Sequence, residues 1–88
     1  MHRYKYSYNI EPEADVEAFL HACSMIENAN IDGIQKTDFA IDVDGSLLQF
    51  YQVPEGEIKV LNDCEVGAVY ADSDVDLSAL FTPASFSD

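Results

Sequence analysis

The stretch TDFAIDVDGSLLQFYQV, residues 37–53, decides the fold because it sets a turn signal between two runs of strand-forming residues. Asp44-Gly45 at its centre is typical of a type I′ turn, which joins two antiparallel strands through a two-residue loop. The stretch therefore predicts a β-hairpin. In that register the expected cross-strand pairs are Val43 with Ser46, Ile41 with Leu48, and Phe39 with Phe50.

The predicted register also assigns the hairpin side chains to two faces, since successive residues of a strand point to opposite sides. One face is expected to carry Phe39, Ile41, Val43, Leu48 and Phe50. The other is expected to carry Asp38, Ala40, Asp42, Leu47, Gln49 and Tyr51.

A strand and a helix are predicted before the hairpin. Residues 2–10 alternate between Tyr or Ile and polar side chains, which indicates a half-buried strand. Pro12 is suited to a first helical turn, so we expect a helix to begin near residue 12 or 13. Residues 28–33 are expected to end it. Its apolar stripe comprises Val16, Phe19, Leu20, Cys23 and Ile26.

After the hairpin, residues 57–61 and 65–71 predict two further strands around a turn at Asn62-Asp63. Residues 73–76 match a capping box and predict a short helical turn, followed by a flexible tail over residues 82–88. The order β-α-β-β-β-β predicts an α+β fold with a small antiparallel-rich sheet and one long helix on one face. We expect a single domain over residues 1–81.

The composition is that of a folded domain. Hydrophobic residues make up 48% of the 88 residues and include five Phe and five Tyr, too many for a disordered acidic tail. Cys23 and Cys64 lie in apolar patterns and are expected to be buried free thiols. The sequence shows no secretory signal and no membrane-spanning stretch, so we expect a cytoplasmic protein, in the host cell if a phage encodes it.

The spacing of the candidate ligands and catalytic residues does not fit known motifs for metal binding or catalysis. Asp42-Val43-Asp44-Gly45 is similar to the middle of an EF-hand loop, but Ala40 and Tyr51 occupy the positions of the first and last ligands. His21 and Cys23 are two residues apart and do not share a helix face, which disfavours a zinc site. We therefore expect no cofactor, no metal and no enzymatic activity.

The charge is the unusual property of this chain. Seventeen Asp and Glu stand against four Lys and Arg, a net charge of −13, which excludes direct nucleic-acid binding as an expectation. Residues 1–10 carry Arg3 and Lys5 and no acid, whereas residues 11–88 carry all the acids against Lys36 and Lys59. Such self-repulsion disfavours a compact state and points to a cationic partner.

The charge also matches that of a short DNA segment. Duplex DNA carries one charge per about 1.7 Å, so 13 charges correspond to about 22 Å of duplex. In size, acidity and α+β pattern, residues 11–76 resemble the phage-type DNA-mimic inhibitors, a group that includes many anti-CRISPR proteins. The resemblance implies a non-enzymatic inhibitor that blocks the cationic nucleic-acid-binding surface of a nuclease or of a CRISPR or restriction-type complex.

The partner-binding residues are expected in the strands, turns and loops that border one sheet. Same-face residues of a strand lie about 6.6–6.8 Å apart, so rows of carboxylates can imitate rows of phosphates. An exposed Tyr51 or Leu47 is expected to add an apolar contact. The candidate residues are Asp38, Asp42, Asp44, Tyr51, Glu55, Glu57, Asp72, Asp74 and Asp76.

Three other functions fit the same composition. An immunity protein or antitoxin that neutralises a basic nuclease toxin is equally acidic. A self-associating module is a second alternative, with the first strand pairing edge to edge into a homodimer. Adaptation to high salt is a third, in which the acidity carries no information about a partner.

Overall fold

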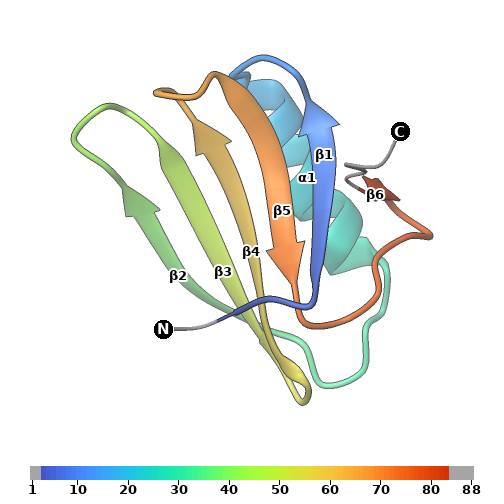
Figure 1. The fold of residues 1–88 in the computed structure, drawn as a ribbon. Helices are drawn as coiled ribbons and strands as arrows, with labels where there is room; N and C mark the ends of the chain where they lie inside the picture. Colours follow the sequence, from blue (N-terminus) through green and yellow to red (C-terminus); the bar gives the residue numbers. More distant parts are fainter. Residues whose placement is uncertain (1–2, 84–88) are drawn as a thin grey trace.

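The hydrophobic pattern of the chain builds one antiparallel sheet with one helix on one of its faces (Figure 1). The computed structural model describes residues 3–83, and the predicted α+β class is confirmed. The strand order is β2-β3-β4-β5-β1-β6, with every described pair antiparallel. The elements are β1 (Tyr6–Glu11), α1 (Val16–Asn28), β2 (Gln35–Ile41), β3 (Leu47–Val53), β4 (Gly56–Asp63), β5 (Ala68–Ser73) and β6 (Thr82–Pro83).

Helix α1 begins at Val16, later than predicted, because Asp15 is its N-cap. The Asp15 carboxylate accepts hydrogen bonds from the N–H groups of Glu17 (2.9 Å) and Ala18 (3.4 Å), which supplies partners for two of the free donors of the first turn. The buried stripe is narrower than predicted, since Val16 and Leu20 are exposed. It consists of Phe19, Ala22, Cys23 and Ile26.

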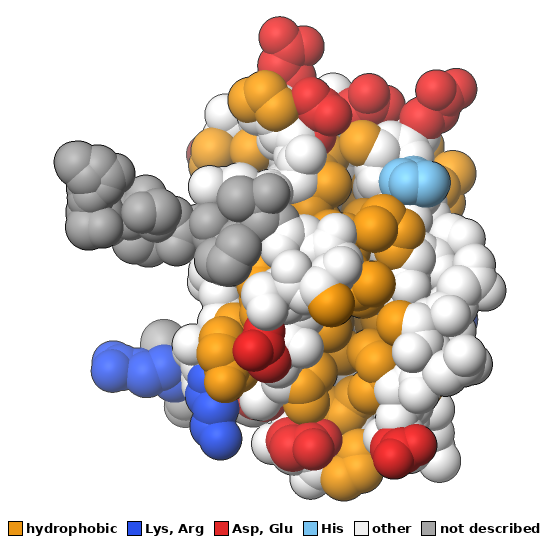
Figure 2. All heavy atoms as spheres, turned by 90° about the vertical axis from the view of Figure 1, so that its right-hand side faces the viewer, with side chains coloured by type: hydrophobic (Ala, Val, Ile, Leu, Met, Phe, Trp, Pro, Cys, Tyr) orange, Lys and Arg blue, Asp and Glu red, His pale blue; other side chains and the backbone are white. Residues whose placement is uncertain are grey.

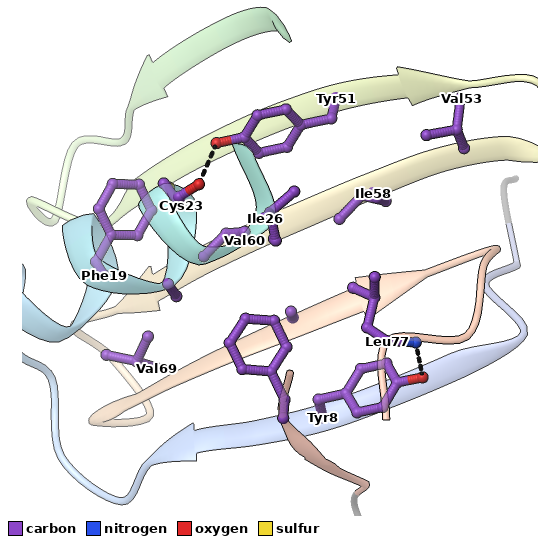
Figure 3. Close-up of a cluster of buried hydrophobic side chains, with 13 residues drawn as sticks. Tyr8, Phe19, Cys23, Ile26, Tyr51, Val53, Ile58, Val60, Val69 and Leu77 are labelled. Carbon is purple, nitrogen blue, oxygen red and sulfur yellow. Dashed lines mark hydrogen bonds between the residues drawn. The ribbon is translucent and has the colours of Figure 1, made fainter. Parts of the chain in front are cut away.

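The core lies between α1 and the sheet (Figure 3). Ile58 and Val60 of β4 and Val69 of β5 are fully buried there. Tyr8 of β1 is 1% exposed, and its hydroxyl accepts a hydrogen bond from the Leu77 N–H (2.7 Å). This bond holds the segment after β5 against the core, where Leu77 is also buried.

The β2–β3 hairpin forms, but its register differs by one residue from the prediction. A type I′ turn needs a positive φ at both central residues. Among the described residues Asn30 is the one non-glycine with a positive φ, so Asp44 does not meet this condition. Instead, the Asp42 N–H donates to the Ser46 carbonyl (2.8 Å) and Gly45 takes a φ of 90°, which gives a three-residue loop with a glycine bulge.

The register shift places Tyr51 on the same face as Phe39 and Ile41, which is the face that the helix covers, so the expectation of an exposed Tyr51 is wrong. Its side chain is 1% exposed, and its hydroxyl lies 2.7 Å from the Glu27 carboxylate and 3.4 Å from the Cys23 carbonyl. Leu47 shares this face and is half-buried. A slip of one residue exchanges the two faces of a strand, which accounts for the error.

The C-terminal half also departs from the prediction. The β4–β5 turn lies at residues 64–67, because Asn62 is buried and its side chain accepts the Asp15 N–H (2.9 Å). Cys64 is therefore exposed, contrary to prediction, whereas Cys23 is buried as predicted. A hydrogen-bonded turn follows Leu77 in place of the expected helical turn.

The first strand does not form an edge of the sheet. Thr82–Pro83 of β6 pair with Tyr8 and Asn9, so β1 has β5 on one side and β6 on the other. The predicted flexible tail began at residue 82, and its part over residues 84–88 lies outside the described residues. Among the described strands β2 is the edge farthest from β1.

Candidate functional site

The strand directions place the connections at two ends of the sheet. At one end the Asp15 N–H donates to the Asn62 side chain (2.9 Å), and the Cys64 N–H donates to the Ser46 hydroxyl (2.8 Å). These bonds tie together the connection into α1, the β2–β3 loop and the β4–β5 turn. The α1–β2 loop, the β3–β4 turn and the segment after β5 lie at the other end, called here the opposite end (Figure 1).

Eight carboxylates gather at the end where α1 begins, and we call this set the acidic rim. No Lys or Arg occurs in the three connections that form it. Figure 2 shows Asp and Glu side chains along this upper edge of the molecule with no Lys or Arg beside them, whereas the lower part carries both acidic and basic side chains. The members are Glu11, Glu13, Asp15, Glu17, Asp42, Asp44, Asp63 and Glu65.

The four aspartates of the rim have a local structural role. Each accepts hydrogen bonds from backbone N–H groups one to three residues onward, at 2.8–3.4 Å. Such bonds stabilise turns and helix starts, and they favour Asp and Asn at these positions. The bond from the Ser46 N–H lowers the pKa of the Asp44 carboxyl, which keeps it ionised. The aspartates are Asp15, Asp42, Asp44 and Asp63.

The four glutamates of the rim differ from the aspartates. Within residues 3–83 no side chain pairs with the carboxylates of Glu11, Glu13 and Glu65. Glu17 lies in the first turn of α1, where the helix dipole favours a negative charge. Glu11, Glu13 and Glu65 therefore add uncompensated negative charge to the rim, and their carboxylates make no hydrogen bond that would stabilise the fold.

At the opposite end, carboxylates meet cations and hydroxyls. The Lys59 ammonium lies 3.8 Å from the Asp72 carboxylate and 5.4 Å from the ring centroid of Tyr4. The Tyr4 hydroxyl donates to Glu57, and burial together with this bond raises the pKa of Tyr4. Lys36 lies 3.1 Å from Glu27. Many carboxylates at the opposite end therefore form contacts within the molecule.

Another carboxylate at the opposite end, Asp74, is part of the packing. Asp74 is 7% exposed and accepts the Glu57 N–H (2.9 Å). A Cβ added to Gly56, which has a φ of 149°, would lie 2.7 Å from the Asp74 Cγ. The contact requires glycine at position 56. Asp74 is therefore a structural residue and not part of an exposed surface.

The structure separates the predicted partner-binding residues. Asp42 and Asp44 belong to the rim, Asp38 lies on the outer strand β2, and Tyr51 is buried. The remaining five lie at the opposite end: Glu55, Glu57, Asp72, Asp74 and Asp76. The prediction missed six rim residues, since only the strand directions reveal that their connections meet.

A groove lies between α1 and β1, beside the acidic rim. It has a volume of about 290 Å³ and is lined mainly by apolar side chains such as Ile10, Met25 and Phe81. Figure 2 shows an apolar band in this region below His21, the pale-blue side chain. Small-molecule sites combine an apolar lining with several convergent polar groups. The polar side chains here are Asn9, Glu11 and His21.

Over residues 3–83 no group of three His, Cys, Asp or Glu is arranged to hold a metal ion. No described helix has the length and apolarity needed to cross a bilayer. Comparison with protein-family models, with curated proteins and with solved structures gives no match for this chain.

Proposed function

We propose that this chain is a small acidic inhibitor, without catalytic activity, that binds the cationic nucleic-acid-binding surface of a nuclease or of a CRISPR or restriction-type complex. The acidic rim makes the contact and blocks access of DNA or RNA. The observation that carries the proposal is the gathering of eight carboxylates at one end of the sheet, in three connections without Lys or Arg and at the ends of the elements they join.

The dimensions of the rim support phosphate mimicry. The strands β2, β3, β4, β5 and β1 are neighbours in the sheet, and strands lie about 4.8 Å apart, so the strand ends span about 19 Å. One DNA strand carries about five or six phosphates over that length. The strand ends and their turns carry five of the rim carboxylates, and the chain leading into α1 and its first turn, behind the sheet in Figure 1, carry Glu13, Asp15 and Glu17.

The division within the rim supports a role beyond local structure. The aspartates are explained by the turns that they cap, whereas Glu11, Glu13 and Glu65 only add repulsion to a chain of net charge −13. A cationic partner turns this repulsion into attraction. It raises the association rate, and salt weakens the effect.

The proposal is tested by capturing the target with two matched variants. The tagged protein is incubated at low salt with lysate of the cells that carry its gene, and bound proteins are eluted with duplex DNA and, separately, with salt. The rim variant carries Glu11→Gln, Glu13→Gln and Glu65→Gln. The control variant also removes three negative charges, but at the opposite end, through Asp32→Asn, Glu55→Gln and Asp76→Asn.

We expect duplex DNA to displace a nucleic-acid-binding protein from the parent chain. We also expect the rim variant to associate with that protein at least ten-fold more slowly, and the control variant to differ from the parent by less than three-fold. Equal losses in the two variants would show that net charge alone acts and would overturn the proposal. A captured protein that DNA does not displace, or recovery of this chain alone, would overturn it as well.

A further inference from the structure

Helix α1 leaves one edge of the sheet uncovered. It packs against β4 and β1, and Tyr51 of β3 bonds to it, while β2 lies beyond its side (Figure 1). All seven residues of β2 are exposed. Four large apolar side chains are more than half exposed on the helix side of this edge, and we call them the β2 shelf: Val16, Leu20, Phe39 and Ile41.

The members of the shelf come from two adjacent rows. Val16, Leu20 and Glu27 share one side of α1, and Glu27 pairs with Lys36 of β2 at 3.1 Å. Phe39 lies beside the helix, with its ring centroid 6.5 Å from that of Phe19. The side of α1 that carries Val16 and Leu20 therefore faces β2, so the shelf is one apolar surface and not four isolated residues.

The backbone of β2 offers hydrogen bonds along the same edge. The Asp42 N–H bonds to the Ser46 carbonyl, and hydrogen-bonded pairs alternate with non-bonded pairs in an antiparallel ladder. The next non-bonded pairs are Ile41 with Leu47 and Phe39 with Gln49. The N–H and C=O groups of Phe39 and Ile41 therefore point away from β3, to a side where the described chain places no strand.

The charges around the edge of β2 determine which kind of segment can bind there. Asp38 and Asp42 flank the exposed backbone groups, and Asp44 lies in the adjoining loop of the acidic rim. A second copy of this chain would bring a further charge of −13 and place its own aspartates against these. Like charges opposed across a strand pair are destabilising. These aspartates repel a second copy of the chain, whereas they attract a cationic segment.

We propose that an extended segment of the target protein, in which apolar residues alternate with Lys or Arg, adds to β2 as a further strand. Its apolar side chains lie on the β2 shelf, and its cations face Asp38 and Asp42. This docking rests on the proposed function, because the occupant belongs to the protein that the rim binds. Main-chain bonds give such strand addition its affinity, and alternate side chains give it specificity.

A defined peptide tests the docking apart from the target. The probe is a labelled seven-residue peptide that alternates Val and Lys, matched to the length of β2. One control peptide has the same composition with the Val residues in one block and the Lys residues in another. A second control is the alternating peptide with N-methyl groups along one edge, which removes its hydrogen-bond donors there. Binding is measured by fluorescence anisotropy at a fixed moderate salt concentration.

We expect the alternating peptide to bind at least ten-fold more tightly than either control peptide. The double variant Phe39→Thr, Ile41→Thr is expected to lose at least ten-fold in affinity. The matched control is Val66→Thr, an exposed apolar residue in the β4–β5 turn, which is expected to bind as the parent does. Equal affinity for the alternating and the block peptide would overturn the proposal, because charge alone would explain it.

A second variant guards against misfolding of the first. Ile41→Pro removes an N–H group that points away from β3, and proline is tolerated at such edge positions. It is expected to abolish peptide binding while the circular dichroism spectrum stays that of the parent. Shelf variants that capture the target as the parent does, beside a rim variant that fails, would refute the docking and leave the proposed function standing. Failure of the parent to capture any target would refute the proposed function instead.

Discussion

The two ends of the sheet use the same residue types in different ways. At the opposite end, Lys36 and Lys59 pair with Glu27 and Asp72, and Asp74 is packed against Gly56. At the acidic rim, eight carboxylates lie in three connections and at the adjoining ends of β1, α1 and β4, and the three connections contain no Lys or Arg. The net charge of −13 is therefore not spread evenly over the surface. Most carboxylates at the opposite end bond to other parts of the chain, whereas Glu11, Glu13 and Glu65 of the rim bond to no described side chain.

Two glycine substitutions test how tightly each end is packed, and they have the largest expected effect. Gly56→Ala at the opposite end is expected to lower the free energy of unfolding by about 3 kcal/mol, since it adds a clash with Asp74 to the strain of a φ of 149°. Gly67→Ala at the rim has a φ of 81° and no neighbour within 4 Å, and should cost about 1 kcal/mol. Urea denaturation of both variants measures the difference. Equal costs would show that Asp74 is not locked in place.

Two tyrosines sharpen the comparison with a smaller effect. Tyr51 donates to Glu27 at 2.7 Å toward the opposite end, and Tyr70 donates to Asp63 of the rim at 3.2 Å. Tyr51→Phe is expected to lower the free energy of unfolding by about 1.5 kcal/mol, since the hydroxyl is buried and its acceptor is charged. Tyr70→Phe is expected to cost about 0.5 kcal/mol, because Tyr70 is partly exposed.

The pH dependence of the Tyr51 effect provides its control. The bond from Tyr51 lowers the pKa of Glu27, so its stabilising contribution is complete above the unfolded-state pKa and disappears as the pH falls through the folded-state value. The cost of Tyr51→Phe should therefore shrink between pH 7 and pH about 3. A cost that stays constant over this range would exclude ionised Glu27 as the acceptor that matters.

Single glutamates at the two ends should change stability in opposite directions, by small amounts. Glu65→Gln at the rim relieves repulsion and is expected to raise the free energy of unfolding by about 0.3 kcal/mol at low salt. Glu27→Gln removes the charge paired with Lys36 and weakens the bond from the Tyr51 hydroxyl, and it should lower the free energy of unfolding by about 1 kcal/mol. In about 1 M salt, where the screening length is about 3 Å, the gain at Glu65 should vanish. Changes of the same sign at both ends would contradict the contrast between them.

The sequence predicts the elements of this fold better than their register. Helix α1 and the β2–β3 hairpin follow from local periodicity and were predicted, although the helix begins at Val16 because of the Asp15 cap. Asp-Gly suits both a two-residue and a three-residue loop, and the backbone angle at Asp44 decides between them. The residue types in the loop do not reveal the backbone angle at Asp44. The one-residue difference placed Tyr51 on the wrong face.

The candidate site was less predictable than the fold, because it depends on how distant connections meet. Asp42 and Asp44 were predicted, but Glu13 and Glu65 join them only because β4 and the start of α1 meet at the same end as the β2–β3 loop. The sequence shows how many carboxylates there are, but it does not show which of them bond to other parts of the chain. Asp74 was predicted as a surface residue, and its burial follows from a glycine 18 positions earlier.

The rim also sets limits on how its own residues can evolve. The four glutamates bond to no described backbone group, so a lineage can exchange them one at a time as its target drifts, without unfolding the protein. The four aspartates can change only to residues that still cap a turn, with asparagine the closest. Among divergent descendants that share the proposed function, we expect rim positions 11, 13, 17 and 65 to vary together with the target, while positions 15, 42, 44 and 63 alternate within a short list of polar residues.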